Sequence, residues 1–428
     1  LAKFVLNDVL KLKERFGASK KKDERVVVEF AGPNTNKPLH LGHLRNIFLA
    51  QSLIKILEFN GFNVIPVNII NDRGVHICKS MLAYQKWGNN AEPNKKSDHF
   101  VGDWYVKYSQ EEKNHPELEK EIREMLKKWE DKDPEVRTLW GKMNAWVLSG
   151  FAETFKRIGV KFEKEYLESD HYDKGKDLVE KGLNNHIFTK QPDGEIIVEL
   201  EKFKLPNKIV LRSDGTSIYM TQDIALARIR YEDFKMDRLV YVVANEQDLH
   251  FQQLFKILEL LEFPFAKKCY HLSYGMVNLP EGKMKSREGT VIDADDLLDN
   301  MESLAKEEII KRHKLDDNQL NNRSVQIGHG ALRFFIIKYD AIKDIVFNPK
   351  ESLSFEGETG PYVQYTHARI CSILKKYEKG VDPNIDWSLL KEFDEIQLIK
   401  ALDLFQDIIN KAVDQYRPHI VARYALDL

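Results

Sequence analysis

The chain has 428 residues, of which 43% are hydrophobic and 31% charged, and its 65 lysines and arginines against 67 aspartates and glutamates leave a formal net charge of −2. That length predicts two or three domains, each large enough to bury a core, and no stretch approaches the roughly 20 apolar residues of a membrane helix. The three cysteines, Cys78, Cys269 and Cys371, lie far apart without metal-ligand spacing, which excludes a disulfide framework and predicts a reducing compartment, the cytoplasm. The net charge neither requires nor excludes a nucleic-acid partner, so any RNA contact must come from local patches.

The first regular elements that the sequence predicts are a strand, a helix and a second strand. After a basic lead-in over residues 1–25, the β-branched run Arg25–Ala31 (RVVVEFA) is typical of a buried strand. Leu44–Asn60 has helical periodicity, and Asn63–Ile70 (NVIPVNII) predicts the next strand. This order within about 45 residues predicts a parallel βαβ unit, and we assign residues 26–83 to the first half of a Rossmann-type sheet.

The middle of the chain interrupts this alternation. Residues from Tyr84 to Lys181 are rich in Glu, Lys and Trp with few breakers, which predicts a mostly helical insertion that we bound at residues 84–200. Further strands are predicted at Glu195–Leu200, Lys208–Arg212, Arg238–Val243 and Tyr270–Tyr274, with a helix at Gln252–Leu261 between the last two. Residues 201–292 then supply a second βαβ half. The expected fold class is therefore α/β, a Rossmann-type doubly wound parallel sheet split by the insertion.

The remainder of the chain has helical patterns only. Residues 293–356 predict a helical connector, and Gly357–Gly360 (GETG) marks a boundary before an all-α region over residues 357–428. Because the chain starts at Leu1 rather than at Met and its last region stops at Leu428, we expect both ends to be incomplete.

The most informative residues stand in the loop after the first strand, Pro33–His43 (PNTNKPLHLGH). Two histidines flank a glycine, as His40-Leu41-Gly42-His43, directly between a strand and a helix. Such a site offers imidazole donors and helix N-terminal N–H groups to phosphate oxygens, and Gly42 leaves room for a nucleotide against the backbone. The motif predicts a nucleotide site, of a kind that adenylyl-transferring enzymes of several types share.

A second motif is the basic, glycine-bearing segment Gly282–Thr290 (GKMKSREGT), which follows the last predicted strand. Lys283, Lys285 and Arg287, with Lys267 expected nearby, can neutralise the charge that grows on a leaving pyrophosphate. A basic loop by itself is usually a solvated surface, but together with the H-x-G-H motif it favours a triphosphate site.

The two motifs resemble the HIGH and KMSKS motifs of class I aminoacyl-tRNA synthetases, and four longer stretches resemble the arginyl members of that class. These stretches are Glu29–His43, Leu211–Ala225, Val242–Phe251 and Gln364–Ile373, and the likeness runs from near Val26 to the end of the chain. It implies ATP-dependent activation of L-arginine to arginyl-adenylate with release of pyrophosphate, then transfer of arginine to the 3′-terminal ribose of tRNA(Arg) with release of AMP. It also implies that activation requires bound tRNA and that the all-α region is of the anticodon-binding type.

The resemblance also assigns the ATP end of the site. Ser286 occupies the position of the second lysine of KMSKS, and the arginyl family compensates with a lysine just before HIGH, which here is Lys37. The ATP-binding residues implied are Lys37, His40, Leu41, Gly42, His43, His250, Lys283, Ser286 and Arg287, and the catalytic ones among them are Lys37, His40, His43 and Lys283. Mg²⁺ is expected on the phosphates, and no metal ligand is named in the chain.

The arginine end requires carboxylates, because a guanidinium group is planar, permanently charged and rich in donors. Asp223 lies one helical turn after Tyr219, and Glu29 stands in an otherwise apolar strand. The alternatives are a helix-terminal charge for Asp223 and an exposed strand face for Glu29. The arginine-binding set that the resemblance implies is Glu29, Gly32, Asn34, His43, Tyr219, Asp223 and Gln247, in which the two amides serve the ammonium and carboxylate groups and the tyrosine supplies a hydroxyl and a flat wall.

Four residues near the start of the last region, Gln364, Tyr365, His367 and Arg369, either contact RNA through stacking and phosphate bonds or pack a helix junction. We expect a monomer with arginine, ATP and tRNA(Arg) as partners and no membrane contact. Two other functions fit part of the sequence. A small-molecule nucleotidyltransferase shares the H-x-G-H chemistry but needs neither the insertion nor the terminal helices, and a non-catalytic tRNA-binding paralogue would account for the altered KMSKS motif.

Overall fold

The central sheet of the protein has five strands. The computed structural model describes residues 1–278, 280, 292–378 and 385–428. The strands of the sheet are β1 (Arg25–Glu29), β2 (Asn63–Ile70), β3 (Lys164–Leu167), β7 (Arg238–Ala244) and β8 (Cys269–Tyr274). They lie in the order β3-β2-β1-β7-β8, and each neighbouring pair is parallel. Because the order reverses between β1 and β7, the sheet is doubly wound with its switch point between those strands, which confirms the expected fold class.

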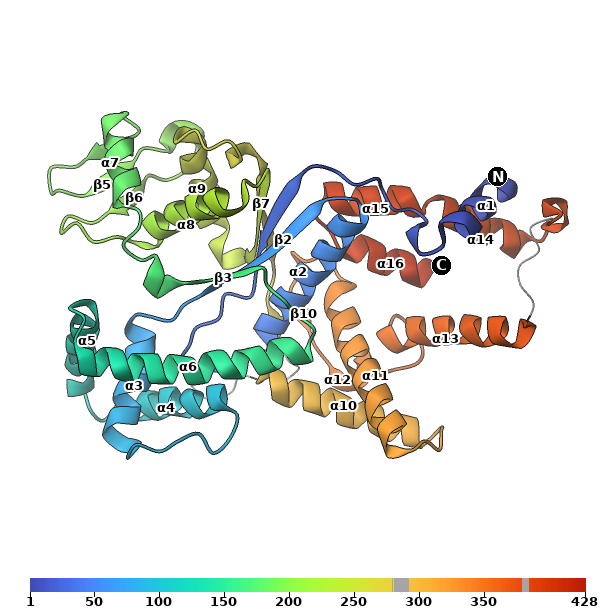
Figure 1. Cartoon of the computed structure of the whole chain (residues 1–428), viewed down its shortest axis with the longest axis horizontal. Coiled ribbons are helices and arrows are strands. Elements are labelled where there is room, and N and C mark those ends of the chain that lie inside the picture. The colour runs from blue at the N-terminus through green and yellow to red at the C-terminus, as the bar shows by residue number, and fades with distance from the viewer. Residues whose placement is uncertain (279, 281–291, 379–384) are drawn as a thin grey trace.

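Alternating side chains of β1 divide the interior into two cores. Val26 is buried on one face of the sheet with α2 (Leu41–Phe59), whereas Val27 is buried on the other face with α8 (Tyr219–Phe234) and α9 (Asp248–Leu260). Figure 1 shows α8 and α9 on the opposite side of the sheet from α2. A strand buried on both faces has a continuous apolar sequence, and full burial of one valine stabilises the fold by roughly 1.5–3 kcal/mol.

The insertion is mostly helical, as its composition predicts, but it also supplies a strand of the central sheet. Helix α3 (Val75–Trp87) begins before residue 84 and leads into the insertion, whose other helices are α4 (Ser97–Glu111), α5 (Glu117–Glu130), α6 (Pro134–Arg157) and α7 (Lys176–Asn184). The prediction of a mostly helical segment from Tyr84 to Lys181 did not include β3, which pairs with the second half of β2. This strand has only four residues, two of them charged, and a short, polar edge strand has little local signal.

A second, antiparallel sheet stands apart from the central one. Its strands are β4 (Phe188–Lys190), β5 (Ile196–Val198) and β6 (Lys208–Leu211). Two of them were predicted as strands, but they pair with each other rather than with the parallel sheet, because short connections join antiparallel neighbours. The second βαβ unit is β7, α9 and β8, as predicted. The boundaries proposed for the domains stay a prediction.

In the remaining described residues the regular elements are helices and one short strand pair. The helices are α1 (Ala2–Leu12), α10 (Ala294–Ile310), α11 (Asp317–Ile337), α12 (Pro349–Ser352), α13 (Gly360–Tyr377), α14 (Phe393–Asp403), α15 (Phe405–Asp414) and α16 (His419–Asp427). The strand pair is β9 (Val277–Asn278) with β10 (Ile345–Val346), and the short 3-10 helices are η1 (Lys13–Arg15), η2 (Glu168–Asp170), η3 (Glu201–Phe203), η4 (Asn245–Gln247), η5 (Ala266–Lys268) and η7 (Trp387–Leu389).

These terminal helices pack back onto the part of the molecule that contains the central sheet. Helices α10, α11 and α15 contact α2, and α1 contacts α14, so the two ends of the chain lie in the same region (Figure 1). None of the described helices combines the length and the apolar character that crossing a membrane requires.

Candidate active site

A cavity of about 1100 Å³ opens at the carboxyl edge of the central sheet. It is lined by residues that follow β1, β7 and β8 and by the first turns of α2, α8 and α9. This is the switch point of the doubly wound sheet, where such folds bind their ligands. The volume exceeds that of a typical drug-sized ligand site, about 300–1,000 Å³, so the cavity can hold a nucleotide together with a second small molecule.

The two histidines of the H-x-G-H motif form a capping box at the start of α2. His40 is the N-cap residue, and its ring atom Nδ1 accepts a hydrogen bond from the Gly42 N–H at 3.1 Å. The His40 N–H in turn donates to Nδ1 of His43, also at 3.1 Å. Since both Nδ1 atoms are acceptors, the proton of each neutral ring is on Nε2. The motif therefore fixes two imidazole N–H donors beside each other, with ring centroids 4.0 Å apart.

Burial keeps both rings uncharged. Burial, and after it the charge of Lys37, lowers the pKa of His40 to about 3. The pKa of His43 lies well below its ordinary value, because of burial first and of the neighbouring His40 second. Both histidines line the cavity, so at neutral pH they can donate hydrogen bonds to phosphate oxygens without changing protonation state.

The remaining residues of the motif act through the backbone. Leu41 is fully buried, and its N–H donates to the Ile292 carbonyl at 3.1 Å. The expectation of free N–H groups is wrong for Leu41 and Gly42, because both have partners within the protein. A Cβ atom on Gly42 would come within 2.9 Å of the His40 ring. The glycine is therefore required for the capping geometry, and it also lines the cavity.

Lys37 lies beside this motif rather than on the cavity wall. It is not among the residues that line the cavity, yet its charge lowers the pKa of both histidines. Burial lowers the pKa of Lys37 itself. The lysine is thus within electrostatic reach of the proposed phosphate site.

The residues predicted to bind arginine lie together in the same cavity. Its lining includes all seven: Glu29, Gly32, Asn34, His43, Tyr219, Asp223 and Gln247. Tyr219 and Asp223 stand one turn apart at the start of α8, as their spacing predicts. Nε2 of His250 lies 2.6 Å from Oδ2 of Asp223, so the histidine predicted to bind ATP contacts the principal carboxylate of the arginine end.

Glu29 is paired within the protein. It is buried, which excludes the exposed strand face, and its Oε2 atom forms an ion pair with the fully buried Arg230. The Arg230 guanidinium also lies 3.4 Å from the Tyr241 hydroxyl. Burial raises the pKa of Glu29 although the arginine opposes this shift. One oxygen of the Glu29 carboxylate is therefore already in an ion pair with Arg230 in the absence of a ligand.

Sequence reasoning missed a further carboxylate, Glu168 of η2. It directly follows β3, lines the cavity and is close enough to Asp223 for the two charges to interact. Burial raises the pKa of Glu168 to about 7, Arg73 lowers it, and Asp72 and Asp223 raise it further. The Arg73 guanidinium stands 3.8 Å from Glu168. No local sequence pattern predicts that Glu168 lines the cavity, because its position follows from the pairing of β3 with β2.

The second nucleotide motif lies outside the described residues, and this includes Lys283, Lys285, Ser286 and Arg287. The expectation that Lys267 lies near that motif therefore stays a prediction. Lys267 itself belongs to η5, which precedes β8, whereas the cavity is lined by residues that follow β8. Successive residues of a strand advance by about 3.3 Å, so the length of β8 separates Lys267 from the cavity.

The residues proposed for RNA contact are all exposed on α13. The amide of Gln364 donates to the Gln326 carbonyl of α11 at 3.0 Å, so this residue packs a helix junction. Tyr365 and Arg369 stack on each other, with the guanidinium 5.7 Å from the ring centroid. Those two residues and His367 remain available to a partner.

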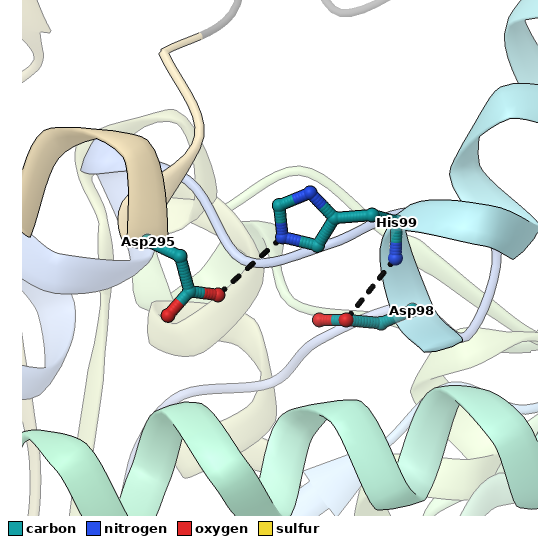
Figure 2. A group of neighbouring side chains, drawn as sticks. All are labelled: Asp98, His99 and Asp295. Carbon is teal, nitrogen blue, oxygen red and sulfur yellow. Dashed lines mark hydrogen bonds and ion pairs between the residues drawn. The ribbon is translucent and has the colours of Figure 1, made fainter. Parts of the chain in front are cut away.

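A cluster of Asp98, His99 and Asp295 resembles a metal site in spacing (Figure 2). The Lys96 ammonium, however, lies 2.8 Å from Asp98 and 2.9 Å from Asp295. A lysine already supplies the positive charge between the two carboxylates, so we assign no metal to this cluster.

The fold, the switch-point cavity and the imidazole capping box together define a class I aminoacyl-tRNA synthetase. Residues 5–349 match the family of tRNA synthetases class I (R), catalytic domain, and residues 363–428 match the DALR anticodon binding domain. The chain belongs to the arginyl-tRNA synthetase family. The two matches favour this family over a small-molecule nucleotidyltransferase.

Similar proteins agree with this assignment. The arginine–tRNA ligase of Treponema denticola is 49% identical over 445 aligned residues, which cover 100% of this chain and 75% of that protein. The structure of Thermus thermophilus arginyl-tRNA synthetase superposes with a TM-score of 0.85 at 25% identity, over 100% of this chain and 76% of the other. The Plasmodium falciparum arginyl-tRNA synthetase has the same fold, with a TM-score of 0.79 at 21% identity over 99% of this chain and 74% of the other. The predicted family and the predicted arginine–tRNA ligase are thereby confirmed.

Proposed function

We propose that the cavity binds ATP and L-arginine side by side and joins them as arginyl-adenylate. The arginine carboxylate attacks the α-phosphorus of ATP, the bond to the β,γ-phosphates breaks, and pyrophosphate leaves. A terminal ribose hydroxyl of tRNA(Arg) then attacks the acyl carbon, and AMP leaves. The observation that supports this function best is that one cavity is lined both by the carboxylates Glu168 and Asp223, which are close enough to interact, and by the neutral imidazole donors His40 and His43.

The carboxylates provide the arginine end. Asp223, oriented by His250, and Glu168 both face the cavity and can accept hydrogen bonds from the guanidinium fork. Tyr219 stands one turn before Asp223 and can cover the planar group. Asn34 and Gln247 are left for the ammonium and carboxylate groups of the substrate. Glu29 contributes mainly through its ion pair with Arg230.

The capping box provides the phosphate end. The Nε2–H groups of His40 and His43 are held by two backbone hydrogen bonds, so they require no reorganisation when charge moves onto the pyrophosphate. Lys37 adds a positive charge nearby, in place of the lysine that Ser286 replaces. We assign Mg²⁺ to the phosphate oxygens and to water, because His40, His43 and Lys37 offer nitrogen donors and positive charge rather than oxygen ligands.

The chain brings no side-chain nucleophile to either step. Positioning of the two substrates and stabilisation of charge supply the rate enhancement, and well-oriented reactants can gain about 7–11 kcal/mol in this way. We propose that the protein acts as a monomer. Its three free cysteines fit the reducing cytoplasm.

We further propose that Tyr365, His367 and Arg369 of α13 contact the tRNA by stacking and by phosphate bonds. They are exposed on the helix that opens the region matched to the DALR anticodon binding domain.

The proposed reaction is tested by exchange of labelled pyrophosphate into ATP, measured with arginine or lysine and with or without tRNA(Arg). We expect exchange with arginine in the presence of tRNA and far less with lysine, which lacks the planar fork. Equal exchange with both amino acids would contradict the assignment of the pocket. Exchange without any amino acid would favour a nucleotidyltransferase, and tRNA binding without exchange would favour a non-catalytic paralogue.

A further inference from the structure

The H-x-G-H motif is bound along its backbone to the segment that begins α10. The Leu41 N–H donates to the Ile292 carbonyl at 3.1 Å, and the Ala294 N–H donates to the Leu39 carbonyl at 2.9 Å. Between these bonds His40 and Asp293 face each other as an antiparallel bridge. The extended backbone of His40, and with it the direction of the ring, therefore depends on where Asp293 and its neighbours lie.

Side chains of the insertion hold the start of α10 in turn. Nε2 of His99, on α4, lies 3.4 Å from a carboxylate oxygen of Asp293 and 3.4 Å from one of Asp295. Figure 2 shows the His99 ring turned toward Asp295 and its backbone N–H toward Asp98. The Lys96 ammonium joins Asp98 to Asp295, at 2.8 and 2.9 Å. Two carboxylates at the first turn of α10 are thus bound to the first turn of α4.

Residues of α6 also contact this cluster. The Thr154 hydroxyl donates to Asp295 at 2.9 Å, and Arg157 lies 3.5 Å from the same carboxylate. Asp98 is fully buried against Gly150, where any larger residue would collide with the carboxylate. The ionic cluster is therefore held by two helices of the insertion, α4 and α6.

Helix α4 also contacts the motif directly, one turn further on. A Cβ atom on Gly102 would stand 2.7 Å from Cδ of Pro38. The helix can approach Pro38 only because this residue is glycine. The same short helix therefore touches the chain just before His40 and holds the segment that lies beside it.

We propose that Lys96 and His99 of the insertion are positioning residues for adenylation, because they hold Asp293 and Asp295 in the place that orients His40. This inference rests on the proposed role of His40 at the phosphates. It gives the insertion a part in the first chemical step. Neither Lys96 nor His99 lines the cavity, so their effect must pass through the backbone bridge.

The ionic contact of His99 makes this positioning sensitive to pH. The hydrogen bond to Asp295 raises the pKa of His99, and Asp293 and Asp98 raise it further, against burial and the charge of Lys96. Burial raises the pKa of Asp293 to about 6. The Asp293 carboxylate is therefore ionised above about pH 6, and the His99 charge is lost as pH rises through its raised pKa. The ion pair between His99 and Asp293 is therefore fully charged between the pKa of Asp293 and the raised pKa of His99. It weakens below the first value and above the second.

The experiment compares His99→Gln with the unaltered chain in arginine-dependent pyrophosphate exchange, with tRNA present, from acidic to alkaline pH. A misplacement of about 1 Å can cost on the order of 100-fold in rate, and we expect kcat to fall roughly 10-fold near pH 7 with the KM for arginine unchanged. The ratio of the two kcat values should approach one at alkaline pH, where His99 is neutral in the unaltered chain. Groups whose titration does not depend on His99 cancel in this ratio, whereas Asp293, which pairs with His99, does not.

A matched control lies on the same helix. Lys107→Met removes an ion pair with Glu111 on α4, away from the bridge, and should leave kcat and its pH profile unchanged. Thermal unfolding of both variants is measured alongside, and equal midpoints separate positioning from loss of folded protein. Lys96→Met is less suitable because it leaves the buried Asp98 unpaired.

A kcat for His99→Gln equal to that of the unaltered chain at every pH would overturn the proposal. So would a constant kcat ratio across pH, or an equal rise in the KM for arginine, since both indicate general loosening of the fold. If the unaltered chain shows no arginine-dependent exchange, the proposed function fails and this inference fails with it.

Discussion

Glu168 provides the sharpest test of the arginine end, because its protonation should control arginine affinity. Its pKa is raised to about 7, mainly by burial, and the ionised form binds a guanidinium cation far better than the neutral acid does, because it adds the opposite charge and accepts charge-assisted hydrogen bonds with both oxygens. Arginine binding must therefore expel a proton wherever Glu168 carries one. Below pH 7, each further pH unit costs about 1.4 kcal/mol, or a factor of ten in affinity. Above pH 8 the carboxylate is already ionised, and the dependence should vanish.

The assay is calorimetric titration of arginine into the protein at pH 6, 7 and 8, in two buffers of different ionisation enthalpy. From a pKa of about 7, the dissociation constant should be roughly tenfold weaker at pH 6 than at pH 8, with about one proton released per arginine at the lower pH. Glu168→Gln should abolish the dependence and weaken binding at pH 8 by about 1.5–3 kcal/mol, the usual contribution of a hydrogen bond to a charged group.

Glu163→Gln is the matched control, because Glu163 is exposed and only five residues away in the sequence. It should bind arginine like the unaltered chain at every pH. Equal affinities of the unaltered chain at pH 6 and pH 8 would refute the reasoning. If the Glu168→Gln variant kept the pH dependence of arginine affinity, that dependence would have to come from another titrating group.

Three further changes test the other residues of the site. Asp223→Asn should raise the KM for arginine in pyrophosphate exchange by at least roughly tenfold, a loss of about 1.4 kcal/mol, and an unchanged KM would remove Asp223 from the pocket. Lys37→Ala should lower kcat for activation far more than it weakens arginine binding, because removing a charge that stabilises the transition state lowers kcat. A change in the KM for ATP alone would mean that Lys37 only pairs with ATP in the ground state. Arg230→Met should lower the free energy of unfolding by about 3–5 kcal/mol, because it leaves the buried Glu29 carboxylate unpaired, and the double variant with Glu29→Gln should recover part of that loss in a denaturant titration. A single variant as stable as the unaltered chain would contradict the buried pair.

The sequence by itself determined the parts of this protein that neighbouring residues encode. The run RVVVEFA predicted β1, the H-x-G-H motif placed a nucleotide site between that strand and α2, and the spacing of Tyr219 and Asp223 put both on one face of α8. The longer motifs predicted the arginyl family, which the comparisons confirm. Strand and helix periods are local properties, so these features could be predicted without knowing the fold.

Only the tertiary structure decided which distant side chains meet. β3 is too short and too polar to be predicted from the sequence. Its pairing with β2 brings Glu168 close enough to Asp223 for the two charges to interact. Likewise no pattern relates Glu29 to Arg230, which are about 200 positions apart and form a pair only because β1 and α8 pack together. Contacts between distant segments depend on strand order and helix packing, and the local sequence does not specify either.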